Sequence, residues 1–267
     1  GSDLMRITFL VIFALSVIIP IGVNDAFAAD GSVKSTVEIN DSTESGPVLS
    51  NQDKFGVSVV NIGDLNGDGV NDMAVGAPYT EVPNSADGTD WCCGGNKPYT
   101  NRGTVFILFM NTDGSVKSTV EIDDTTPNGP VLYTNDAFGR SVANIGDLDG
   151  DGVNDLAVGA KGDNAEPAGA NRGAVHIMFM NTDASVKSTV EINTATPNGP
   201  ALANTDIFGY GVTEIGDLDG NCVNDLAVGA PQDDNGEANR GAVHILFMKA
   251  DAKAKADCEI TLSVSDC

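Results

Sequence analysis

The sequence predicts an all-β protein built from repeated four-stranded sheets. Three observations lead to this fold class: the same blocks of sequence recur three times, apolar residues alternate as in strands within every repeat, and no stretch beyond the N-terminal region has the apolar spacing of a useful helix. With 41% apolar residues among 267, the chain can bury a substantial core. We therefore expect an array of sheets that bury one another face to face.

Four blocks recur in a fixed order, and this repetition defines the domain organisation. They are SVKSTVEI, a Phe-Gly pair that leads into an acidic loop, an apolar run such as MAVGAP, and an Asn-Arg-Gly segment that continues into an apolar strand. The SVKSTVEI block begins at Ser32, Ser115 and Ser185, and the Phe-Gly block begins at Phe55, Phe138 and Phe208. The apolar run begins at Met73, Leu156 and Leu226, and the Asn-Arg-Gly block begins at Asn101, Asn171 and Asn239. The repeats span about 31–113, 114–183 and 184–267, and most of the extra length of the first falls in a polar loop at 79–100.

Each repeat predicts four strands. Thr104–Met110 is apolar at successive positions, as in a strand that is covered on both faces. Met73–Ala77 is short and rich in small residues, which is typical of a crowded inner strand. Val33–Ile39 alternates apolar and polar residues and predicts an outer strand with one solvent-exposed face. Repeated four-stranded sheets that pack face to face are the blades of a β-propeller.

Three repeats are too few for a closed propeller, which has four to eight blades. Ala252–Val264 partly echoes SVKSTVEI and can supply a fourth strand to the last blade. Val33–Ile39 would then have no blade of its own, and its edge could pair with another chain or with the missing part of a longer protein. We expect an incomplete ring that is completed by further repeats or by self-association.

The charge balance restricts the partners of the chain. Only 14 Lys and Arg residues oppose 38 Asp and Glu residues, which gives a formal net charge of −24. Nucleic acid is not an expected partner, because binding to a phosphate backbone depends on basic patches. Divalent cations are the natural counter-charge for clustered aspartates, which repel one another.

The N-terminal residues 1–28 predict export. A basic residue follows Met5, an apolar run covers Ile7–Val23, and AFA at 26–28 has the pattern of a cleavage site. We expect a signal peptide and no membrane span after its cleavage; a retained anchor is the alternative. The mature chain, residues 29–267, is expected to be secreted or to lie at the cell surface.

Export permits disulfides, but the five cysteines match neither a disulfide framework nor the paired CxxC pattern of a zinc site. They are Cys92, Cys93, Cys222, Cys258 and Cys267. The favoured pairing is a local bridge between Cys258 and Cys267.

The order Phe-Gly, then DxDxDGxxD, then Gly-Ala-Pro resembles the FG-GAP repeat of the integrin α-subunit β-propeller and its prokaryotic relatives. The resemblance covers roughly residues 31–250, and it is specific because three elements recur at consistent offsets. It implies that Phe-Gly opens the innermost strand, that the acidic loop is a calcium-binding hairpin between the first two strands, and that Gly-Ala-Pro ends the second strand. It also implies a protein-binding or adhesive role at the cell surface.

Calcium takes six to eight oxygen ligands from carboxylates, amides, backbone carbonyls and water, and the acidic loops offer such a set. Positions 1, 3, 5 and 9 of each loop supply side-chain oxygens, and position 7 supplies its carbonyl. The predicted ligands are Asp64, Asn66, Asp68, Val70 and Asp72 in the first loop; Asp147, Asp149, Asp151, Val153 and Asp155 in the second; and Asp217, Asp219, Asn221, Val223 and Asp225 in the third. Magnesium is disfavoured because it demands a stricter octahedron. We expect about three calcium sites.

The third loop departs from the pattern of the other two. Asn221 replaces aspartate at position 5, and Cys222 stands at position 6 where the other loops have Gly69 and Gly152. Glycine allows a positive φ in a tight loop, whereas another residue there costs about 1–2 kcal/mol. The third site is therefore predicted to be the weakest.

Two other interpretations of the loops are disfavoured. An EF-hand-type loop, including that of dockerin, requires an acidic residue at position 12, and Val75, Val158 and Val228 occupy that position. Ordinary turns do not require four carboxylates.

No catalytic constellation is discernible, so we expect a protein that is not an enzyme. His176 and His244 take the place of Phe106 in the fourth block, which favours a packing role, and the recurrent Arg102, Arg172 and Arg240 favour structural contacts. The alternatives to an adhesive or binding role are an accessory or catalytic domain of a secreted hydrolase or phospholipase-type enzyme, and a structural component of the cell envelope.

Overall fold

A computed structural model describes residues 31–81, 101–164, 171–233 and 240–249. The chain divides into two units, Gly1–Thr36 and Val37–Cys267. In the first unit, the described residues 31–36 are exposed and form no strand. All the strands of the described residues belong to the second unit.

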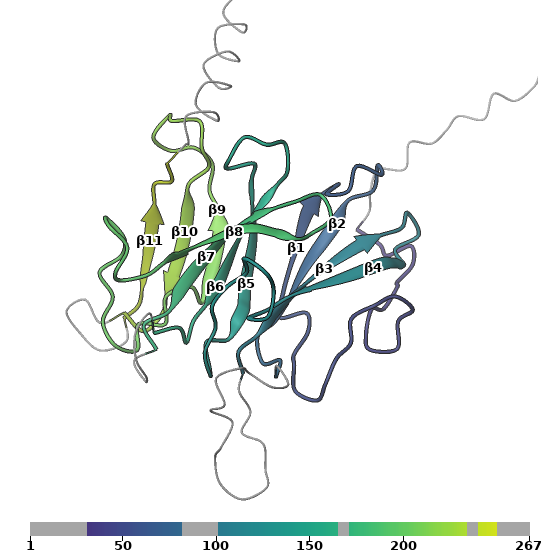
Figure 1. Cartoon of the computed structure of the whole chain (residues 1–267), viewed down its shortest axis with the longest axis horizontal. Helices are drawn as coiled ribbons and strands as arrows, with labels where there is room; N and C mark the ends of the chain where they lie inside the picture. Colours follow the sequence, from purple (N-terminus) through teal and green to yellow (C-terminus); the bar gives the residue numbers. More distant parts are fainter. Residues whose placement is uncertain (1–30, 82–100, 165–170, 234–239, 250–267) are drawn as a thin grey trace, which may run out of the picture. The chain divides into compact units, whose positions relative to one another are not determined.

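The strands form three antiparallel sheets in which each strand pairs with its neighbour in the chain (Figure 1). Blade 1 comprises β1 (Ser58–Gly63), β2 (Asp72–Ala77), β3 (Thr104–Met110) and β4 (Val116–Ile122). Blade 2 comprises β5 (Phe138–Gly146), β6 (Asp155–Ala160), β7 (Ala174–Met180) and β8 (Val186–Ile192). Blade 3 comprises β9 (Gly211–Glu214), β10 (Leu226–Ala230) and β11 (Ala242–Leu246) among the described residues. The predicted all-β architecture of four-stranded, blade-like sheets is confirmed, and the three sheets do not close a ring.

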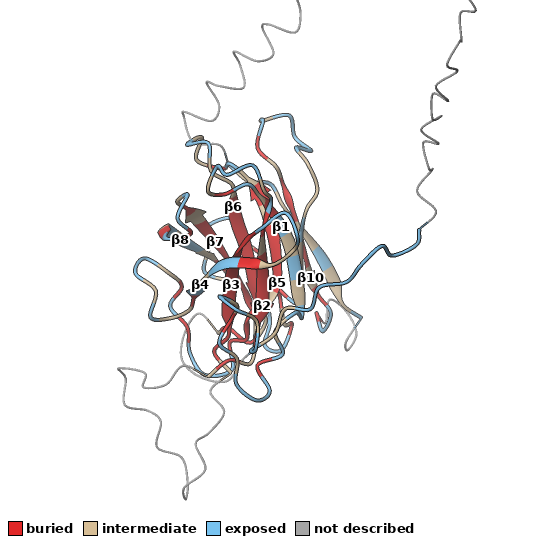
Figure 2. Cartoon of the chain, turned by 90° about the vertical axis from the view of Figure 1, so that its right-hand side faces the viewer, coloured by how far each residue is buried: buried red, intermediate tan, exposed pale blue. Residues whose placement is uncertain are grey.

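Burial follows the order of the strands within a blade (Figure 2). Every residue of β3 and of β6 is buried, as the continuous apolar runs predict for strands that are covered on both faces. In β4 and β8, only the two terminal residues are buried and the residues between them are half-buried or exposed, as expected for an outer strand. The inner strands therefore provide the core, and the fourth strand forms the margin of each blade.

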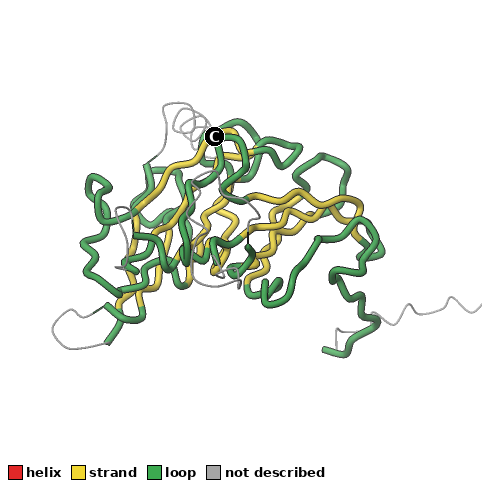
Figure 3. Tube along the Cα trace, turned by 60° about the horizontal axis from the view of Figure 1, so that its bottom comes forward, coloured by secondary structure: helices red, strands yellow, loops and turns green. Residues whose placement is uncertain are grey.

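Strands and loops account for all the described residues, and none of them belongs to a helix (Figure 3). Accordingly, this part of the chain holds no helix with the length and apolar character that crossing a membrane requires. The predicted signal segment, residues 1–28, lies outside the described residues.

The prediction that Val33–Ile39 forms a strand is wrong, because these residues have no strand structure. The other two copies of SVKSTVEI form β4 and β8, which pair with β3 and β7 of the repeat before them. No such third strand precedes the first copy among the described residues, and an isolated strand without a hydrogen-bonded neighbour is not stable in water. The proposed fourth strand of blade 3, within Ala252–Val264, lies outside the described residues.

The sequence repeat and the blade are out of phase. Each blade takes its first three strands from one repeat and its fourth strand from the start of the next, since β4 and β8 lie in the SVKSTVEI block. Consecutive blades are therefore linked through a strand that belongs to the earlier blade.

The Phe-Gly residues of one blade contact the Gly-Ala segment of the preceding blade at the junction between the two. A Cβ atom on Gly76 would lie 1.9 Å from the carbonyl oxygen of Gly139, so this close approach requires glycine. The hydroxyl of Ser58 donates to that same carbonyl at 2.9 Å, and the Phe138 N–H donates to the Arg102 carbonyl at 2.9 Å. The junction between blades 2 and 3 repeats all three features, with Gly159 and Gly209, Ser141, and Phe208 with Arg172.

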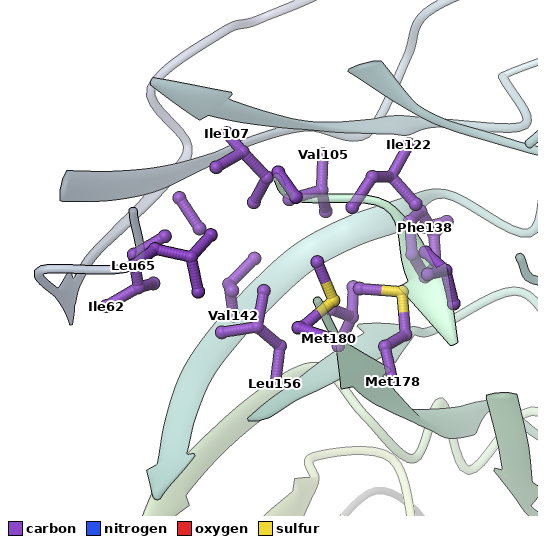
Figure 4. Close-up of a cluster of buried hydrophobic side chains, with 14 of the residues drawn as sticks. Ile62, Leu65, Val105, Ile107, Ile122, Phe138, Val142, Leu156, Met178 and Met180 are labelled. Atoms are coloured by element: carbon purple, nitrogen blue, oxygen red, sulfur yellow. The ribbon is translucent and has the colours of Figure 1, made fainter. Parts of the chain in front are cut away.

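An apolar core fills each junction. Between blades 1 and 2, Val105 and Ile107 face Phe138, Met178 and Met180 of the next blade (Figure 4). We call the side of a blade that carries residues such as Val105 and Ile107 its forward face, because it meets the next blade in the chain. A second core of the same kind joins blades 2 and 3 through residues that include Val175, Ile177, Phe208, Leu226 and Val228.

Candidate metal-binding loops

Each acidic loop connects the first and second strands of its blade, as the resemblance implied. The aspartate at position 1 organises the loop backbone, because its two carboxylate oxygens accept N–H groups from positions 5 and 6. For Asp147, these donors are Asp151 at 2.9 Å and Gly152 at 2.7 Å. For Asp64, they are Asp68 at 2.9 Å and Gly69 at 2.8 Å.

The predicted positive φ at position 6 is confirmed in all three loops. The φ angle is 88° at Gly69, 89° at Gly152 and 69° at Cys222. Cys222 therefore holds a conformation that costs a residue with a Cβ about 1–2 kcal/mol. Position 4 also has a positive φ in every loop, a requirement that sequence reasoning missed although glycine stands there each time, at Gly67, Gly150 and Gly220.

Cys222 is disulfide-bonded. The other four cysteines lie outside the described residues, and so does the favoured pairing of Cys258 with Cys267. The backbone N–H of Cys222 donates to the Asp217 carboxylate at 2.7 Å, so the bridged residue forms part of the loop scaffold itself.

The carboxylates of positions 1, 3 and 5 converge in the second loop. Ligand oxygens of Asp147, Asp149 and Asp151 all lie within 4.8 Å of one another. In the third loop, the corresponding group is Asp217, Asp219 and Asp225, which joins position 9 to positions 1 and 3. These groups offer only oxygen atoms, the donor type that calcium takes. The residues present therefore fit a calcium ion, and the individual ligand assignments stay predictions.

The aspartate at position 9 ties each loop to the third strand of its blade or, in blade 3, to Met248 just beyond that strand. Asp155 is completely buried, and its two oxygens accept the Leu148 N–H at 2.8 Å and the Met180 N–H at 3.0 Å. Burial raises the pKa of Asp155 to about 6, against the opposing effect of these two hydrogen bonds. The same pair of bonds is made by Asp72, to Leu65 and Met110, and by Asp225, to Leu218 and Met248.

The residue at position 7 is held by the side chain at position 5. The Val70 N–H donates to Asp68 at 3.0 Å, the Val153 N–H donates to Asp151 at 2.9 Å, and the Val223 N–H donates to Asn221 at 2.8 Å. This turn fixes the course of the chain through position 7, whose carbonyl we predict as a ligand.

A lysine from the fourth strand reaches the loop of the same blade. The Lys117 ammonium lies 2.6 Å from an Asp68 oxygen, and the Lys187 ammonium lies 2.6 Å from an Asp149 oxygen and also bonds Asp151. The hydrogen bond from Lys117 lowers the pKa of Asp68. Sequence reasoning missed these contacts, although a lysine stands at the third position of every SVKSTVEI copy.

The asparagine at position 8 contacts the preceding blade. The Asn154 amide donates to the Ile62 carbonyl at 3.0 Å, and the Asn224 amide donates to the Ile145 carbonyl at 3.4 Å. The equivalent Asn71 in blade 1 is exposed. The loops of blades 2 and 3 are thus part of the blade junctions.

The histidines have the packing role that their exchange with Phe106 favours. His176 is buried, stacks edge-on against Phe138 with ring centroids 5.5 Å apart, and lies 3.2 Å from an Asp163 oxygen. His244 makes the same edge-on contact with Phe208 at 5.4 Å. Arg102 forms a buried ion pair with Asp124, which agrees with the expected structural contact.

A sequence model of the FG-GAP repeat family matches residues 55–90 and 138–178. The chain contains FG-GAP repeats. The two matched segments begin at the Phe-Gly pairs of the first two repeats, and the second pair, Phe138-Gly139, lies at the junction of blades 1 and 2. The resemblance to FG-GAP repeats is thus confirmed.

Integrin α subunits are similar to this FG-GAP chain. Integrin alpha-PS5 of Drosophila melanogaster is 34% identical over 178 residues, which is 66% of this chain and 15% of that protein. Integrin alpha-4 of Xenopus laevis is 30% identical over 176 residues, 66% of this chain and 14% of that protein. Integrin alpha-3 of Mus musculus is 32% identical over 198 residues, 72% of this chain and 15% of that protein. The chain therefore spans about one seventh of the length of these relatives.

Proposed function

We propose that this FG-GAP chain is an exported, calcium-stabilised propeller-like protein that binds protein or cell-surface ligands. The observation that carries the proposal is the convergence of the loop carboxylates, with oxygens of Asp147, Asp149 and Asp151 within 4.8 Å of one another. The similarity to integrin α subunits supports the adhesive or binding role. The signal pattern in residues 1–28 supports export.

Calcium would be held by the side chains at positions 1, 3, 5 and 9 and by the position 7 carbonyl. When bound, the ion supplies positive charge that offsets the repulsion between carboxylates. The chain supplies a scaffold that is already formed, because backbone N–H groups orient Asp147 and the buried Asp155 anchors the loop to β7. The proposed role is structural, and it does not include catalysis.

The calcium proposal is tested by calorimetric titration and by thermal melting with calcium or with EDTA. Calcium at about 100 times its dissociation constant stabilises the folded state by about 2.7 kcal/mol per site. Asp149→Asn with Asp151→Asn should remove most of the contribution of the second loop. Asp41→Asn with Glu44→Gln is the matched control, because it removes two exposed charges away from the loops. Equal melting temperatures in calcium and EDTA would refute the structural calcium role.

The binding role is tested separately by attachment of intact cells to a surface coated with the full chain. We expect attachment in calcium and its loss in EDTA. The reference surface is coated with the Asp149→Asn, Asp151→Asn variant and kept in EDTA. If cells attach to the wild-type chain in calcium no better than to this reference surface, the binding role is contradicted, even if calcium stabilises the fold.

A further inference from the structure

The outer edge of β11 is the position at which the other two blades carry a fourth strand. In blade 1, β4 pairs with β3, and in blade 2, β8 pairs with β7. In the part of the chain that the structure describes, β11 pairs only with β10. An open strand edge presents a row of backbone donors and acceptors that can accept another strand.

We propose that residues 33–39 of a second copy of this chain add to β11 as the fourth strand of blade 3. The sequence SVKSTVEI at 32–39 is identical to the copies at 115–122 and 185–192, which form β4 and β8. In its own chain this segment forms no strand, and Val33 and Val37 are 78% and 54% exposed. Residues 33–39 therefore have the sequence of a fourth strand but do not form the strand pairing that the other two copies form.

The register of the added strand follows from the two observed pairs. Ile107 pairs with Val120, and Ile177 pairs with Val190. The equivalent pair is Ile245 with Val37 of the second copy. The period-two pattern permits no shift by one residue, because such a shift would turn every apolar side chain to the opposite face.

Charge complementarity supports the same partner. Lys117 and Lys187 bond carboxylates of the acidic loops in blades 1 and 2 at 2.6 Å. Lys34 stands at the equivalent place in the first copy. Addition of residues 33–39 to β11 would bring its ammonium to the third loop, where Asp219 is exposed.

A side-chain hydrogen bond repeats in the same way. The Thr119 hydroxyl donates to the Ser45 carbonyl and the Thr189 hydroxyl donates to the Asn128 carbonyl, each at 2.8 Å. The equivalent donor is Thr36 of the second copy, and the equivalent acceptor is the Asn198 carbonyl. The added strand would thus reproduce the ladder, the lysine contact and the threonine contact of the other two blades.

The residues that follow the added strand would join the two copies. Ile39 and Leu49 already pack against the core of blade 1. They occupy the places of Ile122 and Leu132, which belong to the core between blades 1 and 2. Strand addition would therefore bring the forward face of blade 3 in one copy towards blade 1 of the other.

Exposed apolar side chains on blade 3 and on blade 1 could be buried in this contact between the two copies. Val243, Ile245 and Phe247 on the forward face of blade 3 are 68%, 43% and 58% exposed. Val57 and Val59 are exposed at blade 1. The three blades of the described residues are fewer than the four to eight of a closed ring, whereas two copies together supply six. The contact is head-to-tail and closes as a two-fold pair.

A photo-crosslinking residue, p-benzoylphenylalanine, in place of Val37 tests the proposal in the full chain with calcium. We expect a crosslinked dimer in which mass spectrometry finds Val37 joined to a peptide that contains β11. Sedimentation of the unmodified chain should show a dimer. A monomer with crosslinks only inside one chain would overturn the proposal.

Thr36→Pro tests the strand itself, because proline is excluded from the interior of a paired strand. We expect at least a tenfold weaker dimer and an unchanged melting transition of the monomer, since residue 36 lies before the compact unit that begins at Val37. Thr36→Val is the matched control: it loses the side-chain hydrogen bond but keeps the backbone N–H, and it should weaken the dimer much less than Thr36→Pro. Lys34→Glu should weaken the dimer roughly 2- to 10-fold, and Lys161→Glu, which makes the same change of charge elsewhere, should not.

The edge of β11 could instead be occupied by a strand within Ala252–Val264 of the same chain. Removal of residues 250–267 distinguishes this alternative from the addition of residues 33–39 of a second copy. We expect the shortened chain to dimerise as the full chain does. A full chain that is monomeric and a shortened chain that dimerises would show that the tail fills the β11 edge, and would overturn the proposal. These outcomes do not depend on the adhesive role, which the cell-attachment test measures.

Discussion

The forward faces of blades 1 and 3 carry the same kinds of residue in different surroundings. Val105, Ile107 and Phe109 of blade 1 are buried against blade 2. At the equivalent places of blade 3, Val243, Ile245 and Phe247 are mostly exposed. The neighbouring blade therefore decides whether a blade face is buried, because the same sequence pattern gives a core in blade 1 and an open surface in blade 3.

The largest difference between the two faces is expected for truncation of the central isoleucine. Ile107→Ala should destabilise the fold by about 2–5 kcal/mol, because it leaves a cavity in the core between blades 1 and 2. Ile245→Ala should change the stability of the monomer by less than about 0.5 kcal/mol. Denaturant unfolding at protein concentrations where the chain is monomeric measures both. Equal losses would mean that a further segment covers the forward face of blade 3.

The glycines of the apolar runs give a second, smaller difference. Gly159→Ala would place a Cβ 2.0 Å from the Gly209 carbonyl oxygen and should cost about 1–3 kcal/mol, because the two backbones must separate. At Gly229, the nearest atom, the Gly211 carbonyl oxygen, would be 3.8 Å from the added Cβ, which is an ordinary contact. Gly229→Ala should therefore be neutral within about 0.5 kcal/mol in the same unfolding measurement. A loss of stability for Gly229→Ala as large as that for Gly159→Ala would show that Gly229 also lies in a close backbone contact.

The pH dependence of stability should also differ between Asp136, at the junction of blades 1 and 2, and Asp53, its equivalent in blade 1. Asp136 is buried at the junction of blades 1 and 2, and burial, with the nearby Asp163 carboxylate, raises its pKa to about 8. The unfolded chain releases this proton near pH 4. Stability from the protonated group is therefore full below about pH 4 and is lost as pH rises towards 8.

Asp136→Asn should reduce this decrease in stability with rising pH. The variant should therefore gain stability relative to the wild type between pH 5 and pH 8. Asp53→Asn in blade 1 is the matched control. Thr80 stands there at the place of Asp163, and the repulsion from Glu81 is the smallest contribution to the raised pKa of Asp53, so the change with pH should be smaller. Thermal melting across this pH range measures both, and equal slopes for the two variants would show that the Asp163 carboxylate does not contribute.

Much of the fold could be predicted from the sequence, because strand type depends on local alternation. Thr104–Met110 has apolar residues on both faces and forms the buried β3, and the loops contain the glycine conformations that their tightness requires. Val33–Ile39 shows where this reasoning fails. Its alternation is that of β4, but a strand also needs a hydrogen-bonded neighbour, and no local pattern reports whether one is present.

The candidate site could be predicted only at the level of the loop. The acidic positions were found from their spacing, but the double backbone bond of Asp155 was not, because its donors Leu148 and Met180 are set by tertiary contact. The lysine contacts were missed for the same reason, since Lys187 is distant in sequence from Asp149. Repetition carried the missing signal: Lys117 and Lys187 recur at the same place in the repeat and make equivalent contacts in blades 1 and 2.

The buried aspartate at position 9 also has a consequence for the entropy of ion binding. Because Asp155 holds Leu148 and Met180 through both of its oxygens, the loop is joined to β7 by bonds that involve only protein atoms. Ordering a free backbone costs about 1–2 kcal/mol per residue. A loop that is fixed in this way would avoid most of that cost on binding the proposed ion, so the affinity of each proposed site would depend on its oxygens and very little on the folding of the loop around them.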